Sequence, residues 1–414
     1  MFIERSTRRI RVARTLFVLV GVLPCLALVA WSVARRSPAH RQAITAAWQR
    51  SLGVPIEIGR IEHLRPGVIR AHDCRIGEDG ALVVPVVDVE ASAGEVRLRI
   101  DTLVCDAAGM RLAGDLAAGW IGQAARFPQD CIVEVRSLVW RGAATDATAD
   151  VRVECVAHGG FRAVRIVRRD VDGDSLRIVR GGGVDAAVEV EAHVATPLPV
   201  EVVAAVAGWP AAGVESATCT GTFLGRSQAG RWSGTGDGRI DGIDLAACTT
   251  LLPGRARGRA ALDLRRLDLR DGRLVACDLG FVAGPGEVDR VLLESLVTTL
   301  GCRPGAGLHA ASAAVRGVTR AAGDIRLDPR GIEVVAGPAL DGALVVGEGV
   351  RLIEPPAAII PPERLAWLVA APGAVYVPSS GAGAWLMSVL PDPAAAIDQP
   401  PRPERVGRDG RGDF

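Results

Sequence analysis

The sequence predicts a mainly β fold, with one N-terminal transmembrane helix followed by an elongated, curved antiparallel β-sheet body with few short helices. Two observations predict this fold. An uncharged apolar run near the N-terminus is long enough to cross a bilayer as a helix. Most of the remaining chain alternates apolar and polar residues with a period of two, which is typical of strands with one buried and one solvated face.

The apolar run extends from Thr15 to Ala34 without a charge. At about 1.5 Å per residue, a helix of this length spans roughly 30 Å, the thickness of a hydrocarbon core. Pro24 is expected to kink it, which membrane helices tolerate. Arginines are more numerous before the run than after it, so we expect a cytoplasmic N-terminus and a body on the opposite side of the membrane. The flanking arginines are Arg5, Arg8, Arg9, Arg11 and Arg14 on one side and Arg35, Arg36 and Arg41 on the other.

A cleaved signal peptide is the alternative interpretation of this run. Ser32, Val33 and Ala34 form a possible small-x-small cleavage site, although the run is long for a signal peptide. A lipoprotein anchored through Cys25 fits less well, because Pro24 stands where a small residue is needed.

The body begins with a predicted short helix from Pro38 to Leu52, which Gly53 ends. Further helices are predicted at Leu116 to Phe127 and Glu287 to Leu300, whereas the apolar stretch from residue 365 to 390 is interpreted as strands and turns. The predicted organisation is a cytoplasmic basic segment (1–14), a transmembrane helix (15–34), a juxtamembrane helix (35–52), two β-rich regions (53–200 and 201–390) and a disordered tail (391–414).

Composition argues against nucleic acid as a partner. The formal net charge is +1, all basic residues are arginine, and aromatic residues make up only 4% of the chain. A protein that stacks bases would usually carry more aromatic side chains.

Eight cysteines follow the membrane run, and no two are spaced as Cys-x-x-Cys. Three interpretations stay open: small buried hydrophobes, disulfides in an oxidising compartment, and, with least support, metal ligands. The eight are Cys74, Cys105, Cys131, Cys155, Cys219, Cys248, Cys277 and Cys302.

The glycines at Gly234, Gly236 and Gly238 lack the spacing of a dinucleotide loop and are interpreted as a turn between strands. No serine, histidine or carboxylate pattern indicates a catalytic or metal site. We therefore expect neither enzyme activity nor a cofactor.

Two stretches resemble the AsmA-like family of envelope proteins, relatives of TamB and of bridge-like lipid transfer proteins. Residues 46–105 show the family's short helix, Leu-Gly-x-x-Ile strand and following Pro-Gly strand, and residues 220–301 show its Gly-rich strands, polar hairpin and closing amphipathic helix. The positions that carry the first pattern are Leu52, Gly53, Ile56, Ile58, Ile61, Pro66 and Gly67.

The resemblance implies an inner-membrane protein with a periplasmic body that shields or moves lipid along an apolar β-groove and supports envelope biogenesis. Its partners would be membrane lipids and, in addition, other envelope proteins. The alternative is a structural or assembly scaffold of the envelope without lipid transport, which would have a packed two-sheet core. Candidate groove residues come from the alternating runs: Val184, Val188, Val190, Val194, Leu262 and Leu264.

Overall fold

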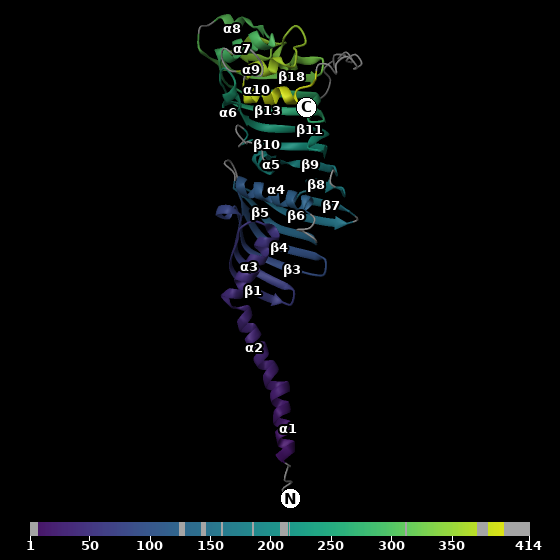
Figure 1. Cartoon of the computed structure of the whole chain (residues 1–414). Helices are drawn as coiled ribbons and strands as arrows, with labels where there is room; N and C mark the ends of the chain where they lie inside the picture. Colours follow the sequence, from purple (N-terminus) through teal and green to yellow (C-terminus); the bar gives the residue numbers. More distant parts are fainter. Residues whose placement is uncertain are drawn as a thin grey trace. The chain divides into compact units, whose positions relative to one another are not determined.

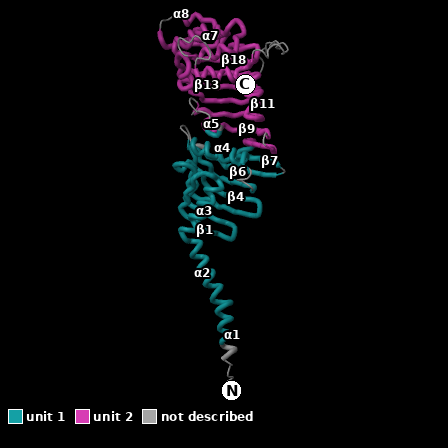
Figure 2. Tube along the Cα trace, viewed as in Figure 1, with its two compact units in different colours: residues 1–172, 205–208 teal, residues 173–204, 209–414 magenta. Residues whose placement is uncertain are grey.

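The computed structural model describes residues 7–123, 129–141, 146–158, 160–183, 186–207, 214, 216–310, 313–370 and 380–392. The chain divides into two compact units, drawn in two colours in Figure 2. Unit 1 comprises Met1–Asp172 and Ala205–Gly208, and unit 2 comprises Gly173–Ala204 and Trp209–Phe414. The boundary that the sequence predicts between the two β-rich regions, at residues 200 and 201, stays a prediction. Most of the predicted tail lies outside the described residues.

The N-terminal helix of unit 1 is built from α1 (Thr7–Phe17), the π-helical turn η1 (Val18–Val22) and α2 (Leu23–Arg35) (Figure 1). Its apolar part, Arg11–Arg35, is 25 residues long, and none of the tested span is buried inside the protein. It is therefore long and apolar enough to cross a membrane. Pro24 lies in the first turn of α2, directly after the π turn. A proline has no amide hydrogen and its ring clashes with the carbonyl four residues earlier, so a widened turn at this place accommodates it.

Helix α3 (Pro38–Leu52) follows, where the sequence predicts a helix. The Ser37 hydroxyl accepts a hydrogen bond from the His40 backbone N–H, and Gly53 ends the helix in the left-handed region. The strands of unit 1 are β1 (Ile56–Arg65), β2 (Val68–Ile76), β3 (Leu82–Ala91), β4 (Glu95–Cys105), β5 (Asp130–Arg141), β6 (Asp146–His158) and β7 (Phe161–Arg168), with the short helix η2 (Glu78–Gly80) before β3.

One strand pair of unit 1 departs from the predicted antiparallel sheet. Strands β4 and β5 are parallel, because α4 (Ala107–Gly122) carries the chain back to the same end of the sheet. This helix begins nine residues before the predicted start at Leu116, and the Asp106 side chain caps it by accepting from the Gly109 N–H at 2.9 Å. The other described pairings in unit 1 are antiparallel.

The core of unit 1 lies on one face of its sheet, under α3. Ile56, Ala71, Val84 and Val135 are among its buried residues, and Trp48 of α3 packs against them. The alternation of buried and exposed positions along these strands follows from their two-residue period.

Unit 2 carries the larger set of strands. They are β8 (Ser175–Arg180), β9 (Val188–Pro199), β10 (Thr218–Gln228), β11 (Arg231–Asp244), β13 (Arg259–Arg270), β14 (Arg273–Ala283), β16 (Arg303–Pro304), β18 (Arg320–Asp328), β19 (Gly331–Ala336), β20 (Val345–Gly347) and β21 (Val350–Glu354). A separate three-stranded sheet contains β12 (Ala256–Arg257), β15 (Gly286–Asp289) and β17 (Val315–Val318). The mainly β fold that the sequence predicts is confirmed.

Helices of unit 2 are short. They are α5 (Val200–Ala207, whose last residues belong to unit 1), α6 (Leu245–Cys248), η3 (Thr249–Leu251), α7 (Arg290–Leu300), α8 (Ala306–Ala310), η4 (Pro338–Leu340), α9 (Arg364–Leu368) and α10 (Gly381–Val389). The helix predicted at Glu287 to Leu300 is present from Arg290 onward as α7, whereas Gly286–Asp289 forms β15. The interpretation of residues 365–390 as strands was wrong for its described parts, which form most of α9 and all of α10.

Candidate functional site

Unit 2 has a continuous apolar face. Residues directly opposite one another on paired strands point to the same side of a sheet, so the strand register identifies which side chains share a face. Four cross-strand rows contain only apolar residues and glycine. They are Val194–Gly221–Gly238–Leu264–Leu279–Ile325–Val334, Ala192–Phe223–Gly236–Leu267–Cys277–Leu327–Ile332, Val190–Gly225–Gly234–Leu269–Leu274, and Leu198–Cys219–Ile240–Leu262–Phe281–Gly323–Ala336. We call these rows, together with Val188, the apolar face.

Five of the six candidate groove residues lie on this face. Val188, Val190 and Val194 come from β9, and Leu262 and Leu264 come from β13. Val184 lies outside the described residues. That these side chains contact lipid stays a prediction.

The middle of the apolar face carries glycine in place of side chains. Gly234, Gly236 and Gly238 lie inside β11, so the interpretation of this stretch as a turn was wrong. A Cβ atom on Gly238 would stand 2.4 Å from the carbonyl oxygen of Thr220, and one on Gly234 would stand 2.4 Å from that of Leu224. The close approach of β10 to β11 therefore requires glycine at these positions.

The ring of Phe223 lies beside these glycines. Its Cε1 atom is 2.5 Å from where a Cβ of Gly225 would be, and its Cδ2 atom is 3.3 Å from a Cβ of Gly236. The face between the β9 valines and the β13 leucines is thus a glycine floor with one aromatic ring on it.

Helices pack over the β14–β19 part of the apolar face. Cys277, Leu327 and Ile332 are buried there, in a cluster with Leu386 of α10 and Leu365 of α9. Toward β9 the face is more open, because Val188, Val190 and Val194 are only half-buried. Phe223 and Ile240 on the neighbouring strands are half-buried as well.

The opposite face of unit 2 is charged. Arg265 and Arg266 form a β-bulge between Leu264 and Leu267, so both arginines leave the apolar face while the leucines stay on it. Arg265 pairs with Asp278 at 3.3 Å and also with Asp324. A cavity of about 540 Å³ lies on this side, over β10, β11 and β13, and its lining includes Thr222, Thr235, Asp237, Arg239 and Asp263.

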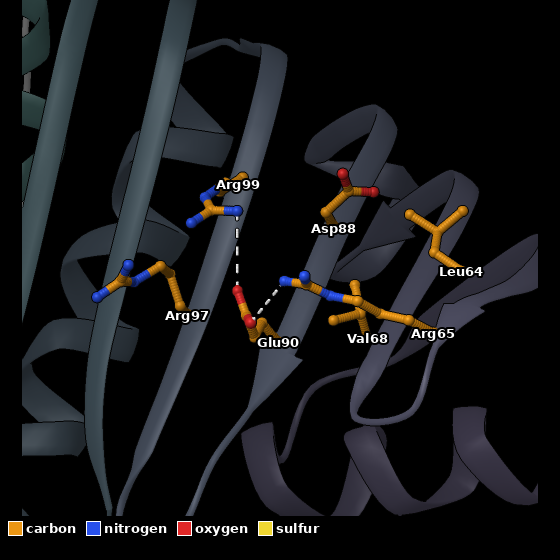
Figure 3. A pocket seen from close by; sticks show the side chains of 7 residues that line it. All are labelled: Leu64, Arg65, Val68, Asp88, Glu90, Arg97 and Arg99. Carbon is orange, nitrogen blue, oxygen red and sulfur yellow. Dashed lines mark hydrogen bonds and ion pairs between the residues drawn. The ribbon is translucent and has the colours of Figure 1, made fainter.

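Unit 1 also has a charged face, with a smaller cavity of about 200 Å³ (Figure 3). Glu90 lies between two arginines there, 2.9 Å from Arg65 and 3.7 Å from Arg99. The third arginine of the lining, Arg97, pairs with Glu95 at 3.0 Å. Because each guanidinium group has a carboxylate partner, the cavity does not offer an unpaired positive charge to an anion.

Asp88 lines the same cavity and is held by Arg70. The Arg70 guanidinium donates two hydrogen bonds to the two carboxylate oxygens, at 2.6 and 2.7 Å. These bonds favour the ionised carboxylate and hold the pKa of Asp88 below its ordinary value. Arg70 and Asp88 are direct partners in the antiparallel register, so the pair joins β2 to β3 on the charged side.

A pair of histidines lies where α3 meets β1. The Nε2 atoms of His40 and His63 are 3.0 Å apart. Burial lowers the pKa of His63, and the positive charge of Arg35 and the neighbouring His40 lower it further. The sequence shows the six histidines as scattered, and only the packing of α3 on β1 brings these two together.

Among the described residues, no three His, Cys, Asp or Glu side chains are grouped so that they could hold a metal ion. No protein-family model, no curated protein and no solved structure matches this chain. The resemblance to the AsmA-like family therefore stays a prediction.

Proposed function

We propose that this protein is a membrane-anchored, AsmA-like envelope protein whose apolar face in unit 2 shields or moves the acyl chains of membrane lipids. The observation that carries the proposal is the half-buried state of Val190 and Val194, which lie in cross-strand rows made only of apolar residues and glycine. Covering such a sheet face with apolar groups removes it from water and lowers the free energy.

An acyl chain suits this face chemically. Each methylene that leaves water stabilises the bound state by about 0.8 kcal/mol, so binding of an acyl chain of ordinary length to this face would be stabilised by several kcal/mol. The rows offer no charged group to a lipid headgroup. The glycine floor of β10 and β11 allows a thin, flexible hydrocarbon chain to approach the backbone closely.

The proposed location is the inner membrane, with a single pass, a cytoplasmic N-terminus and a periplasmic body. Its support is the apolar helix Arg11–Arg35 and the excess of arginines before it. No catalytic role is part of the proposal.

Site-specific photo-cross-linking in intact membranes tests the lipid proposal. A diazirine-bearing amino acid replaces Val190 in the full chain, cells are irradiated, and the purified protein is analysed by mass spectrometry. We expect lipid adducts at residue 190, because its side chain lies on the half-open part of the apolar face. A second substitution, Ala192→Asp, should reduce their yield, because the adjacent row then carries a charge that acyl chains avoid.

Leu224 supplies the matched control. It lies on β10 but points to the charged face, and its side chain is 56% exposed. The same probe there should give few lipid adducts. Adducts to another protein at residue 190, with none to lipid, would replace the lipid proposal by the scaffold alternative.

A further inference from the structure

Two cysteines of unit 1 face each other across a strand pair. Cys131 of β5 and Cys155 of β6 are direct partners in the antiparallel register, and the pair Val133 and Val153 follows two residues further along. Their side chains therefore project from the same face of the sheet. No signal in the sequence links them, because they are separated by a hairpin and have no characteristic spacing.

The separation of the two positions suits a disulfide. Opposite residues of an antiparallel pair have Cα atoms about 4.5 Å or about 5.5 Å apart, depending on the type of pair. A disulfide joins Cα atoms that are about 4.4–6.8 Å apart, so the Cα separation of either type of pair falls within its range.

The other cysteines that lie in described strands have different partners. Each is opposite aliphatic or aromatic side chains and so fits the interpretation as a small hydrophobe. Cys74 faces Ile58 and Val84, Cys105 faces Leu82 and Trp140, Cys219 faces Leu198 and Ile240, and Cys277 faces Leu267 and Leu327.

The surroundings of the pair are apolar. Cys155 is buried, Cys131 is half-buried, and Val164 of β7, directly opposite Cys155, is fully buried. Burial raises the pKa of Cys131 to about 11 and that of Cys155 to about 12. Thiolate is the reactive species, so the folded pair exchanges slowly and the bond forms most readily while the chain is still folding.

We propose that Cys131 and Cys155 are a paired oxidation site that becomes a cross-strand disulfide when the body of the protein is in an oxidising compartment. The oxidant is a disulfide, supplied in the cell by a dithiol–disulfide oxidase. The two Sγ–H groups lose two protons and two electrons, and one Sγ–Sγ bond forms. The S–S bond of the oxidant breaks, and its two sulfur atoms take up the two electrons and the two protons to become two thiols. The proposal relies on the non-cytoplasmic location of the body that is part of the proposed function.

Thiol trapping on the full chain tests the pairing. Cells are quenched with acid, their proteins are denatured in the presence of N-ethylmaleimide, and the purified protein is digested without reductant and analysed by mass spectrometry. A topology reporter fused to the C-terminus records the location of the body in the same cells. We expect a linked pair of peptides containing Cys131 and Cys155, with Cys74 alkylated. Free thiols at both positions in an exported body would overturn the proposal.

A cytoplasmic body would instead overturn the proposed location, and the pairing is then decided with purified protein. The full chain is cycled through thermal unfolding with oxidised glutathione present. A linked 131–155 peptide would support the site, and mixed disulfides with glutathione at both positions would overturn it.

Thermal stability separates a covalent bond from simple packing. We expect the melting temperature of Cys155→Ala to fall by about 5–10 °C more without reductant than with it, because a disulfide constrains the unfolded chain. The control Cys74→Ala removes an equally apolar buried thiol and should lower the melting temperature equally in both conditions. An equal loss for Cys155→Ala in both conditions would contradict a disulfide.

Discussion

Two imidazole rings meet where α3 packs on β1, and their facing nitrogens require opposite roles. With the Nε2 atoms of His40 and His63 3.0 Å apart, one must carry a hydrogen and the other a lone pair. Protonation of both rings replaces the hydrogen bond by repulsion. Arg35 adds a further positive charge close to the pair. The packing of α3 on β1 therefore depends on pH through these two side chains.

This linkage predicts that acid destabilises unit 1. The pKa of His63 is lowered in the folded protein, so the unfolded chain binds the proton first as the pH falls. Stability from this residue is complete above the unfolded pKa of about 6.5 and is lost as the pH falls toward the lower folded pKa. Urea unfolding of the full chain in detergent, between about pH 8 and about pH 5, should show this loss.

The substitution His63→Gln should flatten the pH dependence of the free energy of unfolding. The matched control is His193→Gln, since that side chain is exposed on the charged side of β9. An unchanged pH dependence in His63→Gln would show that other groups carry the acid sensitivity.

At the scale of elements, strands were predictable where their pattern was local. The candidates on β9 and β13 were predicted to share a face because even spacing along a strand keeps side chains on one side, and the Arg265–Arg266 bulge preserves that side for Leu267. Helix α7 was recognisable because one of its faces is apolar and Gly301 ends it.

Other elements depend on distant partners and could not be predicted in this way. Glycine is depleted in strands, so the glycines from 234 to 238 indicate a turn when the sequence is considered alone. Only the structure shows that Gly221 and Gly225 of β10 lie opposite them in a strand pair. The parallel pairing of β5 with β4 follows only from the path of α4. The Cys131–Cys155 pair and the histidine pair likewise depend on register and packing that the sequence does not reveal.

The glycine floor predicts a steric result. A methyl group in Gly238→Ala would collide with backbone atoms of β10 that cannot move independently, so we expect a loss of about 1–3 kcal/mol in the free energy of unfolding. Gly317→Ala in β17 is the control, because a Cβ there meets nothing within 4 Å. It should be neutral or stabilising by roughly 0.5–1 kcal/mol. Chemical denaturation measures both, and equal effects would contradict the role of close strand approach.

At the scale of the whole molecule, both units separate apolar from charged residues across their strands. Arginine supplies all the cations of the charged faces, where it pairs with carboxylates of adjacent strands, as Arg70 does with Asp88 and Arg326 with Glu333. Half-exposed pairs of this kind contribute little stability individually but penalise a shifted register, because like charges would then face one another. The apolar helix Arg11–Arg35 is a third region, with no core of its own.

The anchoring role of that helix predicts the effect of a charge at its centre. Leu23→Arg should lower membrane insertion, since arginine costs about 2.5–3.5 kcal/mol at the middle of a span. Trp31→Arg, nearer the helix end, should cost less because the side chain can reach the interface. Carbonate extraction of membranes measures the retained fraction. Equal retention of both variants would argue against a spanning helix.

The order of strand pairing has a consequence for how the chain acquires its structure. Along β1 to β4 and again along β8 to β11, each strand pairs with the one made just before it, so these pairings join strands that are neighbours in sequence. Pairing between neighbouring strands lowers the contact order, which favours rapid folding. Each new hairpin can add to an edge that already exists, while the chain is still being synthesised. Strand β14 is different: it pairs with β13, made just before it, but its other edge stays unpaired until β18 follows α7 and α8. That interval is when the growing protein is most exposed to misassembly and would benefit most from a chaperone.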